Sequence, residues 1–233
     1  MVRLLALLVA ALLAACAPRP ETTRGLPAEG GGDVRYVALG DSTVEGVGAS
    51  RPELNYVSRI HARLQERYPA ARVRNLGVGG ATSADVRADQ LGPAVELHPN
   101  LVTLSVGPND ITQGVPVQEY EQNIRSVLQT LAGKTSAMIV VNLLPDLAVT
   151  GRFRGSRHEE RVAQLSEQFN SVLRRAAEDH DAEVVDLYTA SREEVPRRPE
   201  LLSADGYHPS DAGYARWAEL MWQGIAKRMP RRG

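Results

Sequence analysis

The sequence predicts a single-domain α/β protein, a three-layer α/β/α sandwich around a five-stranded parallel sheet. Five short apolar runs alternate with segments of helical periodicity along the chain. Strands that alternate with helices form a doubly wound parallel sheet, because right-handed crossovers place the helices on its faces. Hydrophobic residues make up 43% of the chain and charged residues 24%, as in globular proteins. The pattern contains no internal repeat and no second domain.

The predicted strands are short and mostly apolar, as expected of strands that helices cover on both faces. They occupy residues 34–39, 72–76, 101–106, 137–143 and 183–187. Between these runs, apolar residues recur at the spacing of an amphipathic helix. The predicted helices occupy residues 54–68, 83–90, 120–131, 162–176 and 210–229.

The first 15 residues have the pattern of a secretory signal peptide. Arg3 precedes an apolar run over residues 4–15, which is too short to span a bilayer but suits the apolar region of such a peptide. The segment Leu-Ala-Ala-Cys at 13–16 resembles the lipobox of bacterial lipoproteins, which are cleaved before a lipid-carrying cysteine. The resemblance implies lipidation of Cys16 and a place in the bacterial cell envelope, as a periplasmic or outer-membrane lipoprotein where the cell has an outer membrane.

The segment after the lipobox is rich in proline and glycine and has almost no apolar residues. We interpret residues 16–33 as the lipidated Cys16 and a flexible tether, residues 34–229 as the folded domain and residues 230–233 as a tail. Cys16 is the only cysteine, so an intrachain disulfide and a zinc site built from cysteines are both excluded.

Charge and motifs exclude several other classes of function. The formal net charge is −1, from 27 basic and 28 acidic residues, whereas nucleic-acid binding favours a basic surplus. The chain contains neither a G-x-x-x-x-G-K-[ST] nor a G-x-G-x-x-G phosphate-binding sequence, and no H-E-x-x-H zinc motif. We therefore expect no metal and no cofactor, and we favour a monomer.

Polar residues of the types used in catalysis follow several predicted strands, where ligands bind in folds of this kind. The blocks are Gly-Asp-Ser-Thr at 40–43, Asn-Leu-Gly-Val-Gly-Gly-Ala-Thr-Ser at 75–83, Gly-Pro-Asn-Asp at 107–110 and Asp-Gly-Tyr-His-Pro at 205–209. Each block alone is compatible with a turn or a helix cap. Only their combination carries a functional prediction.

Together the four blocks resemble those of the SGNH hydrolases, also called GDSL-type lipases and esterases, over essentially the whole domain. The resemblance implies the flavodoxin-like SGNH fold and a serine esterase that forms an acyl-enzyme. It assigns Ser42 as the nucleophile and Asp205 and His208 as the other triad members. Thr43 replaces the leucine of the motif name, at a position that tolerates change.

The same resemblance assigns the oxyanion donors to Ser42, Gly80 and Asn109, with Gly79 as the alternative to Gly80. These residue types suit acyl transfer. An imidazole can take the serine proton and return it to the leaving alcohol, and a carboxylate fixes the tautomer of the imidazole. The negative oxygen of the tetrahedral intermediate needs preorganised donors. Such a site requires neither a metal nor a cofactor.

The substrate is less sharply indicated than the reaction. We expect a small-molecule or lipid acyl ester, as for a lipase, lysophospholipase or thioesterase. The alternatives are a carbohydrate O-acetylesterase and a non-catalytic, envelope-binding lipoprotein, against which the intact triad argues. Residues 145–157 carry three arginines around one phenylalanine, and we expect Arg152, Phe153 and Arg154 to contact the substrate. A solvated surface loop is the alternative for this segment.

Overall fold

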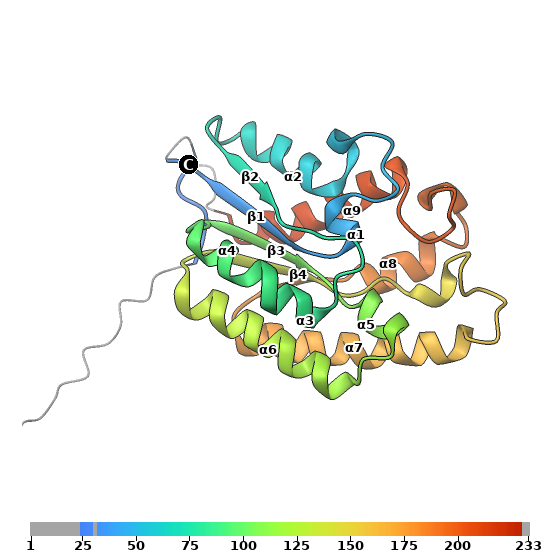
Figure 1. Ribbon diagram of the computed structural model, residues 1–233. Helices are drawn as coiled ribbons and strands as arrows, with labels where there is room; N and C mark the ends of the chain where they lie inside the picture. Colours follow the sequence, from blue (N-terminus) through green and yellow to red (C-terminus); the bar gives the residue numbers. More distant parts are fainter. Residues whose placement is uncertain (1–23, 30–31, 230–233) are drawn as a thin grey trace, which may run out of the picture.

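Five parallel strands form the centre of the computed structural model, which describes residues 24–29 and 32–229 (Figure 1). The strands are β1 (Arg35–Gly40), β2 (Arg72–Asn75), β3 (Leu101–Ser105), β4 (Met138–Asn142) and β5 (Glu183–Val185). Their order in the sheet is β2-β1-β3-β4-β5. The predicted fold class and the five strands are confirmed, and this order is the flavodoxin-like one.

The helices form a layer on each face of the sheet (Figure 1). The longer ones are α2 (Tyr56–Gln65), α6 (Val117–Lys134), α7 (Glu159–Asp179), α8 (Leu187–Glu194) and α9 (Asp211–Lys227). The shorter α segments are α1 (Ser42–Glu45), α3 (Ser83–Asp85), α4 (Leu91–Glu96) and α5 (Pro108–Gln113). Short 3₁₀ or π turns are η1 (Pro52–Leu54), η2 (Val86–Gln90), η3 (Leu147–Val149) and η4 (Pro199–Leu201).

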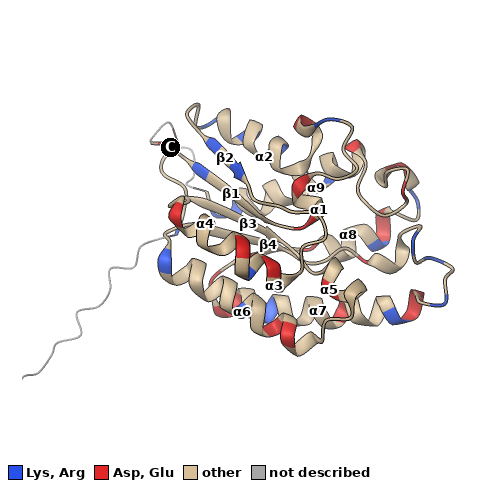
Figure 2. Cartoon of the chain, viewed as in Figure 1, with Lys and Arg blue, Asp and Glu red and all other residues tan. Residues whose placement is uncertain are grey.

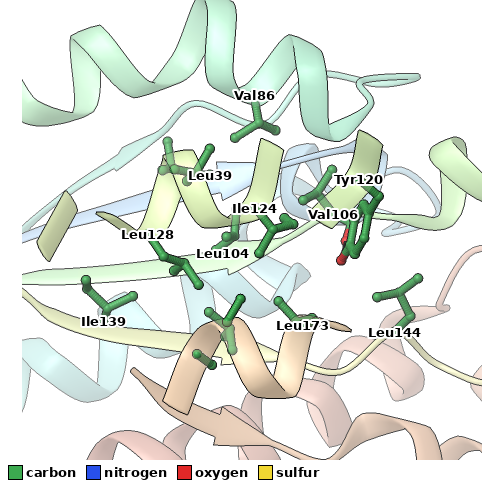
Figure 3. Packing of buried hydrophobic residues seen from close by; sticks show 14 of the residues in the cluster. Leu39, Val86, Leu104, Val106, Tyr120, Ile124, Leu128, Ile139, Leu144 and Leu173 are labelled. Carbon is green, nitrogen blue, oxygen red and sulfur yellow. Dashed lines mark hydrogen bonds between the residues drawn. The ribbon is translucent and has the colours of Figure 1, made fainter. Parts of the chain in front are cut away.

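Side chains on alternate positions of the strands divide the core into two layers. Val37 and Leu39 of β1 pack with α6 and α7 (Figure 3), whereas Tyr36 and Ala38 pack with α2 and α9. Every residue of β3 and β4 is buried, which explains the continuous apolar runs of the sequence. The register aligns the ends of β1 and β3, with Gly40 opposite Ser105. The chain leads from β1 to β2 on one side and then to β3 on the other side of β1, and ligands in such folds bind in the crevice at this switch point.

The edge strand β2 departs from the expectation of strands covered on both faces. Arg72, Arg74 and Asn75 are exposed and Val73 is only half-buried. β2 has a single neighbour, β1, so part of its surface remains open to solvent. Only Val73 and Leu76 are apolar among residues 72–76, and this composition agrees with an edge position.

Residues 24–29, which the sequence places in the flexible tether, pack against the domain. Leu26 is 4% exposed, and the Tyr68 hydroxyl donates to the carbonyl oxygen of Pro27 at 2.7 Å. The Arg24 guanidinium donates to the carbonyl oxygens of Ala132 and His180 at the ends of α6 and α7. This segment lies where the strands begin, opposite α1 (Figure 1). Cys16, most of the predicted tether and residues 230–233 lie outside the described residues. Within the described ranges, no helix is long and apolar enough to cross a membrane.

Candidate active site

Three of the predicted site residues form a chain of hydrogen bonds beyond the ends of the strands. Ser42 Oγ lies 2.9 Å from His208 Nε2. His208 Nδ1 lies 2.6 Å from Asp205 Oδ2. Ser42 begins α1 directly after β1, and the other two residues belong to the loop that leads into α9. The fold thus brings together side chains that are more than 160 positions apart in the sequence.

The Ser42 turn requires a glycine at position 40. Gly40 has φ +147°, and a Cβ there would lie 1.9 Å from the carbonyl oxygen of Ser105. The following residue, Asp41, caps α1 by accepting hydrogen bonds from the Thr43 backbone N–H at 2.9 Å and the Thr43 hydroxyl at 2.8 Å. These contacts set the path of the backbone on which Ser42 stands.

Gln90 holds the same turn from a distant part of the chain. Its Oε1 accepts from the Gly40 N–H and its Nε2 donates to the Gly40 carbonyl oxygen, both at 2.8 Å. The side chain is buried and belongs to η2, a π-helical turn, a distortion that is frequent near functional sites. Sequence reasoning missed Gln90, because no pattern links a glutamine to a backbone 50 positions away.

The carboxyl group of Asp41 is fully buried behind Ser42. Burial raises its pKa to about 6, and the hydrogen bonds from Thr43 oppose this shift. Its second oxygen, Oδ2, has no hydrogen-bond partner within residues 24–29 and 32–229. The carboxyl group of Asp41 is therefore costly to ionise in this position.

The loop that carries Asp205 and His208 is fixed by its own turn. Asp205 Oδ1 accepts from the Ser203 hydroxyl at 2.8 Å and from the backbone N–H groups of Tyr207 at 2.8 Å and His208 at 2.9 Å. Desolvation, the largest single influence, raises the pKa of Asp205, but these hydrogen bonds and the one from His208 outweigh it and hold the pKa well below its usual range. The ionised carboxylate favours a proton on His208 Nδ1, which leaves Nε2 free to accept from Ser42.

Two of the predicted oxyanion donors, Gly80 and Asn109, belong to the segments that follow β2 and β3, the two neighbours of β1 in the sheet. The Asn109 side chain donates to the carbonyl oxygen of Ala81 at 3.0 Å, and Gln113 donates to that of Gly80 at 3.2 Å, so α5 holds the turn that contains Gly80. Gly80 has φ +82°, a conformation that favours glycine. In the described part of the chain, the backbone N–H groups of Ser42, Gly79 and Gly80 donate to no other group. The choice between Gly79 and Gly80 thus stays a prediction.

The buried side chain of Asp110 supports the segment that follows Gly80. Asp110 accepts from the Ser83 backbone N–H at 2.9 Å and from the Ser83 hydroxyl at 2.5 Å, and burial raises the pKa of Asp110. Asn123 of α6 donates to the same hydroxyl at 3.1 Å. The neighbour of Asn109 therefore ties α5 to the segment that follows Gly80.

A cavity of about 100 Å³ opens beside Ser42, Asn109 and His208. Its walls are largely apolar and include one side of each of two neighbouring helices. The residues on these sides are Leu187, Ala190, Ser191 and Glu194 of α8, and Gly213, Arg216, Trp217 and Leu220 of α9. Positions with this spacing share one side of a helix, so about two turns of each helix, roughly 10 Å, border the cavity. Glu194 and Arg216 form an ion pair in its wall, at 2.8 Å.

The arginine-containing loop reaches the site through two of its three predicted residues. The Arg152 guanidinium carbon lies 5.0 Å from the Tyr207 ring centre, and the Phe153 ring meets the edge of Tyr207 at 6.1 Å. Arg154 is exposed, and its side chain makes no hydrogen bond or ion pair with the described residues. Among those residues, no group of three histidine, cysteine or acidic side chains is arranged to hold a metal ion.

Comparisons with known proteins agree with this arrangement. The model of the GDSL-like lipase/acylhydrolase family matches residues 38–216. The acetylxylan esterase of Geobacillus stearothermophilus is 25% identical over 206 residues, which cover 79% of this chain and 90% of that enzyme. The esterase TesA of Pseudomonas aeruginosa is 25% identical over 188 residues, which cover 80% of this chain and 85% of that enzyme. A crystal structure of the Geobacillus acetylxylan esterase matches with a TM-score of 0.70 at 24% identity, covering 88% of this chain and all of that one. The chain therefore belongs to the GDSL-like lipase/acylhydrolase family and is a GDSL/SGNH-type ester hydrolase.

Proposed function

We propose that the protein hydrolyses acyl esters through an acyl-enzyme at Ser42. The observation that carries this proposal is the chain of hydrogen bonds from Ser42 through His208 to Asp205 at the mouth of an apolar cavity. A serine hydroxyl becomes a nucleophile when an adjacent base can take its proton. His208 is placed to be that base, and Asp205 to stabilise the imidazolium that forms.

The reaction then has two halves. His208 Nε2 takes the proton of Ser42 Oγ as that oxygen bonds to the carbonyl carbon, and the carbonyl oxygen becomes an oxyanion. The backbone N–H groups of Ser42 and Gly80 and the side-chain amide of Asn109 stabilise its charge. His208 returns the proton to the alcohol as the ester bond breaks. A water molecule then repeats the sequence on the acyl-enzyme and releases the acid, which restores Ser42.

The cavity supports an acyl group longer than acetyl. Its apolar walls along α8 and α9 would bury methylene groups, each worth about 0.8 kcal/mol when removed from water. Acetyl esters would leave most of this apolar length unfilled. SGNH hydrolases include enzymes for acetyl esters and enzymes for longer acyl esters. The cavity is therefore the feature that favours the longer acyl group here.

A carbohydrate O-acetylesterase is the second candidate, favoured by the similarity to the Geobacillus acetylxylan esterase. The two candidates differ in the acyl group that they release. We expect kcat/KM to rise from acetate to hexanoate in a series of p-nitrophenyl esters. A maximum at acetate, together with acetate release from acetylated xylan, would support the second candidate.

The esterase proposal is tested by labelling with a fluorophosphonate probe. We expect the folded wild-type protein to be labelled and Ser42→Ala to remain unlabelled, because the probe bonds to an activated serine oxygen. Both proteins should show the same thermal unfolding midpoint. A folded wild-type protein that is not labelled would contradict the proposal and favour a binding role in the envelope.

We also propose that a lipid on Cys16 anchors the protein in the bacterial cell envelope. The lipobox-like segment at 13–16 supports this anchor, and two or more acyl chains on one residue suffice for stable attachment. A Cys16→Ser variant should move from the membrane fraction to the soluble fraction. An unchanged distribution would contradict the anchor and leave the esterase proposal intact.

A further inference from the structure

Arg152 stacks on aromatic rings beside the site and has no acidic partner. Its guanidinium carbon lies 5.4 Å from the centre of the Phe153 ring and 5.0 Å from that of Tyr207. Within the described ranges, this guanidinium makes neither a hydrogen bond nor an ion pair. By contrast, Arg125, Arg198 and Arg216 each contact two carboxylates.

The position of Arg152 relative to His208 is defined by these rings. Tyr207 precedes His208, and the two ring centres are 5.1 Å apart in an edge-to-face contact. Since the guanidinium carbon is 5.0 Å from the first ring, it lies at most about 10 Å from the second. Figure 2 shows the basic residues of this loop on a prominent segment near α8.

The backbone of this loop is ordered by its own turn and lies close to that of the His208 loop. Thr150 is buried, and its carbonyl oxygen accepts from the N–H groups of Phe153 at 3.1 Å and Arg154 at 2.9 Å. A Cβ on Gly151 would lie 3.2 Å from the carbonyl oxygen of Gly206. Arg152 therefore projects from an anchored turn, and its guanidinium is held by stacking while its N–H donors stay available.

We propose that Arg152 binds a phosphate on the alcohol part of the ester, which rests on the esterase function proposed above. The acyl part is assigned to the cavity between α8 and α9. Tyr207 lines that cavity, whereas Arg152 stacks on Tyr207 without lining the cavity itself. A guanidinium presents paired donors that match phosphate oxygens.

The distance between Arg152 and the catalytic residues also fits such a substrate. In an ester of glycerol 3-phosphate, six bonds separate the carbonyl carbon from phosphorus, or roughly 7 Å in an extended chain with bonds of about 1.5 Å. A guanidinium–phosphate hydrogen bond adds about 3 Å. The sum of about 10 Å falls in the same range as the greatest possible distance, about 10 Å, between the Arg152 guanidinium carbon and the centre of the His208 ring.

The test compares two soluble esters with the same acyl chain, 1-hexanoylglycerol 3-phosphate and 1-hexanoylglycerol. We expect Arg152→Gln to lower kcat/KM on the phosphorylated ester by about 10- to 100-fold, as for the loss of a charged hydrogen bond. On the neutral ester the change should stay below about threefold. Arg157→Gln is the matched control, because it removes the same charge from the same loop at a side chain that contacts His158, and should leave the ratio of the two rates unchanged.

A second measurement uses glycerol 3-phosphate as an inhibitor of p-nitrophenyl hexanoate hydrolysis. We expect its inhibition constant to rise by about tenfold in Arg152→Gln and to stay constant in Arg157→Gln. Equal losses of Arg152→Gln on both esters, or equal effects of the two substitutions, would overturn the phosphate site and leave the esterase in place. Failure of the proposed esterase itself would show differently, as a wild-type protein that neither hydrolyses p-nitrophenyl hexanoate nor reacts with the fluorophosphonate.

Discussion

The two halves of the Ser42–His208 pair are held in place by different kinds of contact. The Ser42 turn is fixed by buried groups from distant parts of the chain, with Gln90 on the Gly40 backbone and Ser105 accepting from the Asp41 N–H. The Asp205 side chain is 46% exposed, and its hydrogen bonds come from residues 203–208.

This difference separates stability from chemistry. The nucleophile turn is part of the core, so a change there disturbs the packing of β1 against β3. The loop of His208 orders itself through a local turn, so a change there alters proton transfer with little effect on the fold.

Asp205→Asn should lower kcat/KM by about 10³- to 10⁴-fold while Tm changes by no more than about 4 °C. An amide in place of Oδ2 would donate to His208 Nδ1, which moves the imidazole proton to Nε2 and prevents that nitrogen from accepting the Ser42 proton. Ester hydrolysis and thermal unfolding of the same preparation check both parts. A fall in Tm of 10 °C or more, on the order of 3 kcal/mol or above for a chain of this size, would show that this loop also supports the core.

Two glycine substitutions compare the two regions directly. Gly40→Ala should destabilise the fold by about 4 kcal/mol or more, because its Cβ would meet the Ser105 carbonyl oxygen at 1.9 Å. Gly206→Ala should cost only about 1 kcal/mol, since its φ is +68° and its Cβ would make ordinary contacts from 3.4 Å outwards. Urea unfolding curves and soluble yield provide the comparison. Similar losses at the two positions would refute the division between a core-held and a locally held half.

Asp41→Asn should remove a pH dependence of stability. The pKa of Asp41 rises from 3.8 to about 6 on burial, so the folded state holds this proton more tightly than the unfolded state does. Ionisation therefore lowers stability as the pH rises from about 4 to 6. Besides the hydrogen bonds from Thr43, the electrostatic influence of His208 lowers the pKa of Asp41 and that of Asp110 raises it.

Relative to wild type, Asp41→Asn should gain up to about 3 kcal/mol of unfolding free energy between pH 4 and pH 7, at about 1.36 kcal/mol per pKa unit. Denaturant titrations at the two pH values measure the change. Parallel stability curves for both proteins would mean that the carboxylate is solvated in the folded state.

The sequence predicted those parts of the fold and the site that depend on local pattern. The strands, the long helices and the four polar blocks are of this kind, because apolar periodicity and short motifs are visible in a few consecutive residues. Gln90 and Gln113 were missed, since each acts on the backbone of a segment far away in the chain. The helix α8 was not predicted for another reason, because its eight residues are too few to show a clear helical period.

The docked segment at residues 24–29 bears on how an anchored molecule would face its surroundings. It is attached where the strands begin, and Ser42 follows the opposite end of β1, about 20 Å away for six residues of strand. Residues 17–23 separate it from Cys16 and can span at most about 25 Å. A protein held by Cys16, as proposed above, would therefore stand with its catalytic end turned away from its own bilayer. Its substrates would arrive by diffusion or on a facing structure, and the lipids of its own leaflet would be poorly placed to reach it.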